Sequence, residues 1–585
     1  NEDRYILFQT FIENGLEFLL ENFHCNEDNI YHNGRMAYCF SIIRWIKENK
    51  YGNNKYLNKK LGDLSNQIFS NIKCNAANSW YVYPGNEVPR NHTTNAIDCG
   101  IFVDASFDLF KISPEYERNY KHLVDKVALT YNLQKIKTYI DNSLNHKRKP
   151  FVHNQILWNG TGLARWYSMN KENKYSKIIK YNLENLLKFW VAINNPDGGA
   201  HYLSPTKEEP LDSLDGNTTY YHSRQLAFSI YISNLINYKN NEFDQIIKNG
   251  AGFLLRMMRP NGQKELVLDT KRYYHHNLFE SASNPYDIFV FNYLFELTKD
   301  SFWIDLASVS LNNLFLCQQK NGAIHASDEL FNTSWQCNIV RNSHIAWLTR
   351  TNREFITNAV NLNIKKLRGI DKFFDIDSNR SFVNIGNSKS WVKFIITKSR
   401  LSLSAGQRTI GLVPKQFKNI NNLNERNLFS YETKGDLNYF IKNNLIDLLS
   451  SIKWFIYHTK HLIIQKRFSA AYNCLISFLS YLKTYNKLRS EFPLFISELN
   501  IKNDLIMHEL QVADIKGRQI AAIGKRKITF QKGKVNIEDY IYKPGIFNVY
   551  MPYLKEKKFN FKKKYFKVKK NESRKFNFSF YIDDF

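Results

Sequence analysis

The most constraining feature of this 585-residue chain is a glycine corner that recurs after successive apolar helical patterns. The corners are Pro196-Asp197-Gly198, Pro260-Asn261-Gly262 and Asn321-Gly322. Their glycines follow one another at about 64 and about 60 residues, a spacing typical of a repeated supersecondary unit. We therefore expect one pair of helices per repeat, closed by a glycine turn. This is the arrangement that builds an α/α toroid.

The chain has two parts with different hydrophobic patterns. From Tyr5 to about Val360, apolar residues recur at helical spacing between Gly, Pro and Asn turns, which predicts roughly ten to twelve helices. After about residue 370, short β-branched runs such as Phe382-Val-Asn-Ile and Trp391-Val-Lys-Phe indicate antiparallel strands. Helical periodicity returns from Leu437 to Leu488, and strand-like segments then continue to the end.

We therefore predict a mainly α fold with a β-containing C-terminal part, in which an incomplete α/α toroid is followed by an antiparallel β-sheet with a helical insertion. The predicted divisions are the toroid over 1–365, an antiparallel β segment over 366–436, a helical insertion or hairpin over 437–490, and a C-terminal β-rich basic region over 491–585.

Composition limits the partners. The chain is 43% hydrophobic and 15% aromatic, enough to bury a large core, and its formal charge is +27. Such a charge attracts polyanions, although an Asn-, Lys- and Ile-rich composition gives it equally well. No nucleic-acid recognition motif accompanies the charge, so no specific nucleic-acid partner is predicted. The longest candidate membrane stretch, Phe468 to Leu482, falls short of the roughly 18 to 20 residues that span a bilayer, so no transmembrane helix is predicted.

The seven cysteines are scattered, with no CxxC pair and no Cys/His spacing that suits zinc, and we expect free thiols. No metal site or cofactor is predicted, and a divalent ion that assists the chemistry is left open. Because the chain begins at Asn1, the sequence leaves open whether a signal peptide has been removed.

A dense polar cluster, Tyr220 to Gln225, comes directly before an apolar helical run and shortly after Asp215-Gly216. On a helix, Tyr221, Arg224 and Gln225 share one face, while His222 lies about 100° away. Such residues could line one pocket, or they could be a hydrated helix start. We weigh these two interpretations about equally.

Two further clusters carry candidate binding groups. His153-Asn154-Gln155 offers neutral amide donors, which suit a carboxylate or a sugar hydroxyl. Arg272-Tyr273-Tyr274-His275-His276 combines rings, imidazoles and a guanidinium, but adjacent histidines on a strand point to opposite faces, which disfavours a metal site. His325, Trp335, Arg341 and His344 are further stacking or anion-binding candidates.

Two segments resemble the α-toroid polysaccharide lyases of the heparinase II/III and alginate lyase type. They are His153 to Leu163, and Asp215-Gly216 followed by Tyr221-His222 and a Leu/Ile-rich helix. The resemblance implies that Asn154 neutralises a uronate carboxylate while Tyr221 and His222 transfer the proton at C5. The chain departs from the family pattern in two ways. Residues 437–488, which are predicted to be helical, interrupt the strands, and the further histidine that the family's β-sandwich supplies has no assigned counterpart. Predicted substrate-binding residues are His153, Gln155, Arg224, Gln225, Tyr274, His275, His276 and Trp335.

The expected function is therefore action on an acidic, glycosaminoglycan- or alginate-like polysaccharide by C5 proton abstraction. β-Elimination is favoured over C5 epimerisation. An inverting glycoside hydrolase that uses paired acids such as Asp215 and Glu280 is the enzymatic alternative. A glycan-binding or assembly protein without turnover is the other. A lyase would be periplasmic or extracellular and a biosynthetic enzyme cytoplasmic; the oligomeric state is not predicted.

Overall fold

The computed structural model describes a large part of the chain. The described residues are 2–22, 34–49, 55–74, 80–82, 95–144, 152–192, 200, 219–258, 262, 264–265, 279–280, 283–324, 335–364, 382–386, 391–395, 429–436, separate positions between 438 and 482, 487–490, 499–502, 505–512, 521–531, 534–555 and 558–581.

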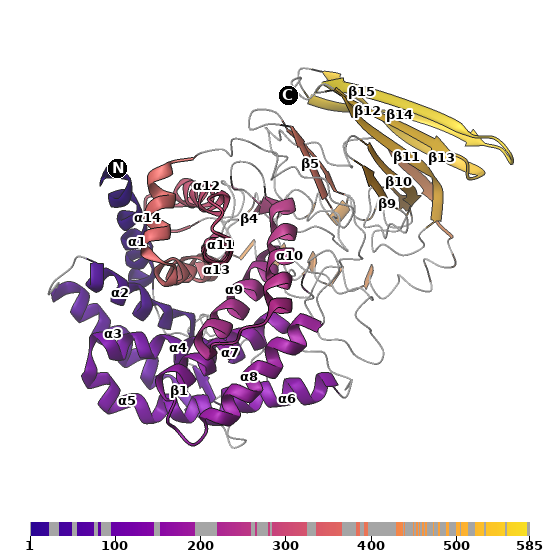
Figure 1. The fold of residues 1–585 in the computed structure, drawn as a ribbon. Coiled ribbons are helices and arrows are strands. Elements are labelled where there is room, and N and C mark those ends of the chain that lie inside the picture. Colours follow the sequence, from indigo (N-terminus) through magenta and orange to yellow (C-terminus); the bar gives the residue numbers. More distant parts are fainter. Residues whose placement is uncertain are drawn as a thin grey trace.

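The N-terminal part of the chain is helical (Figure 1). Three short two-stranded sheets occur among these helices and shortly after them in the sequence. The helices are α1 (Glu2–Glu21), α2 (Tyr38–Asn49), α3 (Lys55–Ser70), α4 (Asn95–Ile112), α5 (Pro114–Lys126), the π-helix η2 (Val127–Asn132), α6 (Leu133–Leu144), α7 (His153–Met169), α8 (Ser176–Ala192), α9 (Thr219–Ile236), α10 (Asn241–Met257), α11 (Asn284–Thr298), α12 (Phe302–Cys317), α13 (Trp335–Ser343), the 3-10 helix η5 (His344–Arg350) and α14 (Arg353–Leu362). The pairings are β1 (Ile72–Cys74) with β2 (Trp80–Val82), β3 (Lys264–Glu265) with β4 (Phe279–Glu280), and β5 (Phe382–Gly386) with β6 (Trp391–Ile395).

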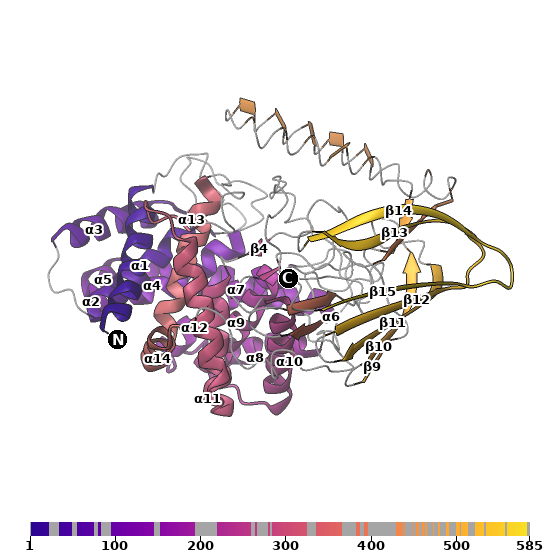
Figure 2. The same cartoon turned by 90° about the horizontal axis from the view of Figure 1, so that it is seen from above.

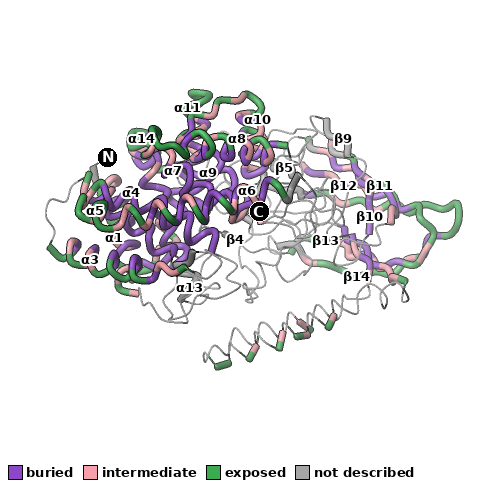
Figure 3. The backbone as a smooth tube through the Cα atoms, turned by 90° about the horizontal axis from the view of Figure 1, so that it is seen from below, coloured by how far each residue is buried: buried purple, intermediate pink, exposed green. Residues whose placement is uncertain are grey.

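The inner helices contact one another in a closed order. Helix α2 contacts α4, which contacts α7, then α9, α11 and η5, and η5 contacts α2 again. Helices α8, α10 and α12 contact α7, α9 and α11, whereas α3 contacts α2, α5 contacts α4 and α13 contacts η5. The inner helices are largely buried, whereas exposed residues gather on outer elements such as α3 and α5 (Figure 3). Almost every residue of α4 is buried, and so are most residues of α11, which places both helices in the interior.

The glycine corners have the predicted helix-closing role. Gly262 follows α10 and Gly322 follows α12, with φ angles of +84° and +82° that favour glycine. At both corners, an isolated antiparallel bridge joins the end of the helix to the residue just after the turn. The earlier corner, at Gly198, lies outside the described residues. The repeat therefore has a common structural unit in its two later copies.

Helices α4 and α7 pack closely through glycine. A Cβ atom at Gly162 would lie 2.4 Å from the Gly100 carbonyl oxygen, and one at Gly100 would lie 2.4 Å from the Trp158 carbonyl oxygen. Any side chain at these positions would therefore force the two backbones apart. The glycines of the Trp158 to Gly162 segment thus serve helix packing.

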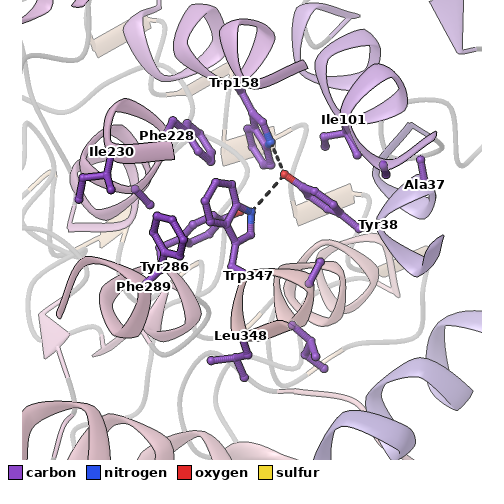
Figure 4. Packing of buried hydrophobic residues seen from close by; sticks show 14 of the residues in the cluster. Ala37, Tyr38, Ile101, Trp158, Phe228, Ile230, Tyr286, Phe289, Trp347 and Leu348 are labelled. Atoms are coloured by element: carbon purple, nitrogen blue, oxygen red, sulfur yellow. Dashed lines mark hydrogen bonds between the residues drawn. The ribbon is translucent and has the colours of Figure 1, made fainter. Parts of the chain in front are cut away.

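An aromatic layer crosses the middle of the inner ring (Figure 4). The Tyr38 hydroxyl accepts hydrogen bonds from the indole nitrogens of Trp158, at 2.6 Å, and Trp347, at 3.1 Å. Phe228 and Tyr286 pack against both indoles. Burial raises the pKa of Tyr38 to about 12, so its hydroxyl stays protonated at neutral pH. This layer joins four inner helices and η5.

A charged network lies one or two turns further along the same helices. Arg350 pairs with Asp104 at 2.6 Å, and Tyr231 donates to the other Asp104 oxygen at 2.9 Å. Arg165 pairs with Asp108 at 3.1 Å. Because Arg165, Tyr231 and Arg350 follow Trp158, Phe228 and Trp347 in chain order on α7, α9 and η5, the network lies toward the C-terminal ends of these elements. The N-terminal ends of these helices lie on the other side of the aromatic layer.

Two antiparallel sheets form the C-terminal part and lie to one side of the helices (Figures 1 and 2). One has the order β14-β13-β7-β8 and the other β15-β12-β11-β10-β9. The strands are β7 (Ser430–Lys434), β8 (Lys487–Arg489), β9 (Leu499–Lys502), β10 (Leu505–Val512), β11 (Ala521–Gln531), β12 (Lys534–Ile541), β13 (Gly545–Lys555), β14 (Lys558–Val568) and β15 (Arg574–Tyr581). Both sheets contribute to one hydrophobic core, separate from that of the helices.

The predicted mainly α fold with antiparallel strands near the C-terminus is confirmed. Strands β7 and β8 pair with each other although residues 435–486 separate them, and the positions described between 438 and 482 are helical. The helical segment is thus inserted between neighbouring strands of one sheet. The four domain boundaries remain predictions.

Glu432 links stability to pH in this sheet. Its carboxylate accepts hydrogen bonds from Lys487 at 3.1 Å and Tyr550 at 3.2 Å. Burial acts to raise the pKa of Glu432, but Lys487 and Arg489 outweigh it, so the pKa lies below its ordinary 4.5. A depressed pKa contributes stability above the unfolded-state value, and this is lost as pH falls through the folded-state value.

We therefore expect Glu432→Gln to lower the free energy of unfolding at pH 7 and to have a much smaller effect in acid, well below pH 4.5. Urea unfolding of both proteins at the two pH values measures the difference. A loss of equal size at both would show that the carboxylate's charge is not what stabilises the sheet.

Within the described chain, no helix is both long and apolar enough to cross a membrane. Cys39, Cys74, Cys99 and Cys317 are free thiols, of which Cys39 and Cys99 are buried.

Candidate functional site

Arg224 is the centre of the candidate site. It lies in the second turn of α9, is almost fully buried, and donates from Nη2 to His344 Nε2 at 3.0 Å. Its guanidinium carbon lies 4.9 Å from the ring centroid of Trp158, 5.8 Å from that of Tyr286 and 6.0 Å from that of Tyr221. A cation, an imidazole and three rings from α7, α9, α11 and η5 therefore meet at the N-terminal side of the aromatic layer.

The hydrogen bond fixes the state of His344. A guanidinium can only donate, so His344 Nε2 accepts and carries no proton. The imidazole is therefore neutral, with its proton on Nδ1. This arrangement places an unprotonated nitrogen beside a fixed positive charge.

Asn154 lies on α7 one turn before Trp158, so their side chains share a helix face. Asn154 is buried, and its Oδ1 accepts no hydrogen bond from any part of the chain that the structure describes. A buried amide oxygen without a donor costs about 1–3 kcal/mol, which a bound hydroxyl would recover. Asn154 Oδ1 is therefore suited to accept a hydrogen bond from a ligand.

Both ring nitrogens of His222 form hydrogen bonds with backbone groups. Its Nδ1 accepts from the Ala200 amide at 3.2 Å, and its Nε2 donates to the Gly250 carbonyl at 2.8 Å. Asn342 has the same role two helix pairs later, accepting from the Ile324 amide at 2.9 Å. With both nitrogens bonded to backbone groups, His222 would have to release one of them to transfer a proton.

The other predicted residues near the two clusters face outward. Gln225 accepts from the Trp190 indole on α8 at 3.0 Å. His153 Nδ1 and the Tyr139 hydroxyl on α6 lie 2.5 Å apart. Gln155 is only partly buried, in the first turn of α7. The structure therefore brings Tyr221 and Arg224 together with His344, a further anion-binding candidate that the sequence did not connect to this cluster. It directs Gln225 and His153 toward outer helices.

Sequence reasoning also missed a buried cluster beside this site. Lys264, on β3, pairs with Asp287 on α11 at 2.5 Å, and both are fully buried. Lys264 also donates to Ser223 at 3.1 Å and to Ser283. Because Ser223 adjoins Arg224 on α9, this ion pair fastens the start of α9 to the start of α11.

Several candidates cannot be placed. Asp215, Tyr274, His275, His276 and His325 lie outside the described residues. Trp335 opens α13 and Glu280 ends β4, but only their backbones are described. Among the residues that the structure does describe, no group of His, Cys, Asp and Glu could hold a metal ion.

No known family profile matches the chain, and no curated protein matches it. Solved structures that it resembles include the cellobiose 2-epimerase from Spirochaeta thermophila, at 9% identity and a TM-score of 0.42, over 57% of this chain and 86% of that chain. The unsaturated glucuronyl hydrolase from Bacillus sp. GL1, responsible for glycosaminoglycan degradation, matches at 10% identity and 0.41, over 60% and 97%. A GH127 β-arabinofuranosidase matches at 8% and 0.37, over 98% and 74%. At these TM-scores the likenesses carry no argument about activity.

Proposed function

We propose that the helical part is an α/α toroid that acts on an acidic, uronate-containing polysaccharide by removing the proton next to the carboxylate. The observation that carries this proposal is the meeting of Arg224, His344, Tyr221 and the Trp158 ring at the N-terminal ends of the inner helices. A sugar acid needs a cation for its carboxylate, a flat ring for its C–H face and a group that takes a proton. This cluster supplies all three.

Arg224 is the proposed carboxylate partner. Removing a proton next to a carboxylate builds negative charge on the carboxylate oxygens, and a preorganised donor lowers the energy of that state. The guanidinium is held between aromatic rings and His344, so it needs little rearrangement when the charge forms. Asn154 remains the proposed second donor, through its amide nitrogen.

Tyr221 is the proposed base and His344 its partner in proton transfer. In β-elimination, Tyr221 acts as the phenolate: its oxygen takes the C5 proton, the C5–H electrons form the C4=C5 double bond, and the C4–O4 bond breaks with its electron pair on O4. The Tyr221 hydroxyl then gives this proton to O4, which restores the phenolate. In this revised assignment His222 is a positioning residue, because both of its nitrogens bond the backbone.

A panel of uronate polysaccharides tests the reaction, with ultraviolet absorbance and proton NMR in D₂O recorded together. We expect new absorbance from the conjugated double bond. Deuterium at C5 without absorbance would instead make the enzyme an epimerase that uses the same proton abstraction. If neither signal arises on any polymer, the proposed reaction is wrong.

Tyr221→Phe is expected to lower turnover at least about a hundredfold while the protein stays folded, because the general base is lost. Tyr293→Phe is the matched control, since it removes a hydroxyl that donates to Asp244 at 2.6 Å at an outer contact. Initial rates and thermal unfolding of both variants give the comparison. Near-normal turnover of Tyr221→Phe would remove Tyr221 from the mechanism.

A further inference from the structure

The outer face of the four-stranded sheet differs from the rest of the C-terminal part. On β13 and β14, Phe547, Val549 and Phe566 enter the core between the sheets. Side chains alternate along a strand, so Tyr550 and its cross-strand partner Lys563 lie on the outer face. We call this outer side of β14, β13, β7 and β8 the basic face.

Cations outnumber carboxylates on the basic face. Among its described residues, the pairing register places five cations and one carboxylate there: Lys434, Lys487, Arg489, Lys563, Lys567 and Glu432. Glu432 is itself buried and bonded by Lys487, Asn548 and Tyr550. Its charge is therefore neutralised within the sheet, and the face presents an excess of positive charge.

Aromatic rings alternate with these cations. Tyr550 lies between Arg489, at 5.2 Å from its ring centroid, and Lys563, at 5.5 Å. Along the outer side of β14, the order is Phe561, Lys563, Tyr565, Lys567, in which the Tyr565 side chain is 66% exposed and Phe561 is 40% exposed. Exposed rings that lie together on one face are typical of a surface that contacts a ligand or a partner.

The outer side of the other sheet carries proportionally more carboxylates. On its outer side, Lys575 pairs with Glu538 at 2.9 Å, and Glu538 also lies opposite Lys527. Glu509 lies opposite Lys525. Two carboxylates therefore offset part of the charge of the four described lysines on this side, whereas Lys534 faces Tyr581 and no carboxylate.

We propose that the basic face is a second, non-catalytic binding site for an acidic polysaccharide. A uronate unit has a carboxylate, which Lys563, Lys567 and Arg489 would bind, and an apolar C–H face, which Tyr565 and Phe561 would cover. The choice of a uronate polymer as the ligand rests on the proposed function. The positive charge and the exposed rings of the basic face are observations that do not depend on that function. The face would hold the polymer while the helical site acts on it.

Binding of the full-length protein to fluorescently labelled polygalacturonate, followed by anisotropy, tests this site. We expect Lys563→Ala/Tyr565→Ala to raise the Kd about tenfold or more, because a cation and a stacking ring are lost together. The matched control, Lys534→Ala/Tyr581→Ala, removes a lysine that lies 5.9 Å from an exposed tyrosine ring on the other sheet. It should leave the Kd unchanged.

Two results would overturn the proposal. One is an equal Kd for the Lys563/Tyr565 variant and the unmodified protein. The other is tighter binding of a single-stranded oligonucleotide of matched charge than of polygalacturonate, which would assign the face to nucleic acid. This assay needs no turnover. If the protein degrades no polymer but binds polygalacturonate through the basic face, the binding site is supported and only the proposed reaction is wrong.

Discussion

Replacing Arg224 with lysine will lower kcat/KM on an acidic polysaccharide by at least about a hundredfold. Lysine keeps the charge, but it loses the planar fork that bonds His344 and the flat surface that stacks on Trp158. The charge that develops on the substrate carboxylate would then meet a mobile ammonium group. Initial rates over a range of polymer concentrations measure the effect, with circular dichroism to verify the fold.

Arg35→Lys is the matched control. The Arg35 guanidinium lies 5.5 Å from the same Trp158 ring, but Arg35 pairs with Asp98 at 3.2 Å. We expect this variant to lose stability and to keep kcat/KM within a few-fold of the unmodified protein. If both lysine variants lose activity equally, Arg224 has no special part in the reaction and the effect is one of packing.

The sequence predicted those features of the fold that local chemistry decides. Apolar spacing gave the helices, and the glycine corners gave their pairing, because a positive φ at Gly262 and Gly322 is a local requirement. The Arg224–His344 contact is different, since 120 residues separate its members. Two repeats of the corners span about the same length, from Gly198 to Gly322. The repeat was therefore the signal that could have connected His344 to the site.

His222 shows why a dense polar cluster is ambiguous. Buried polar atoms need hydrogen-bond partners, and a side chain at a helix start can satisfy either a ligand or a nearby turn. His222 satisfies Ala200 and Gly250, whose backbone groups lie in other elements. No pattern along the chain identifies which backbone groups need a partner, so its role could not be predicted without the fold.

The Lys264–Asp287 pair was invisible for a related reason. A lysine and an aspartate that are far apart in the sequence look like ordinary solvated charges. Both become fully buried only when β3 reaches the starts of α9 and α11. The burial of each charge depends on the other, so neither residue signals it alone.

Arg526→Met will destabilise the two-sheet part of the protein by about 3–5 kcal/mol. Arg526 and Asp539 are almost fully buried and form two hydrogen bonds, of 2.8 and 2.7 Å. Asp539 also accepts from Tyr431 at 2.8 Å. Removing the guanidinium leaves a carboxylate in an apolar core, whereas Arg526→Met/Asp539→Leu removes both charges and should cost less than the single change.

The loss should be confined to the sheets, because their core shares no residue with that of the helices. Urea unfolding followed by near-ultraviolet and helix-sensitive far-ultraviolet circular dichroism separates the two parts. We expect Arg526→Met to move the transition of the sheets to lower urea while most of the helical signal keeps its midpoint. A shift of both transitions by the same amount would mean that the two cores unfold as one unit. If Arg526→Met/Asp539→Leu is less stable than Arg526→Met, hydrogen bonding and not the unpaired charge dominates the energy of this pair.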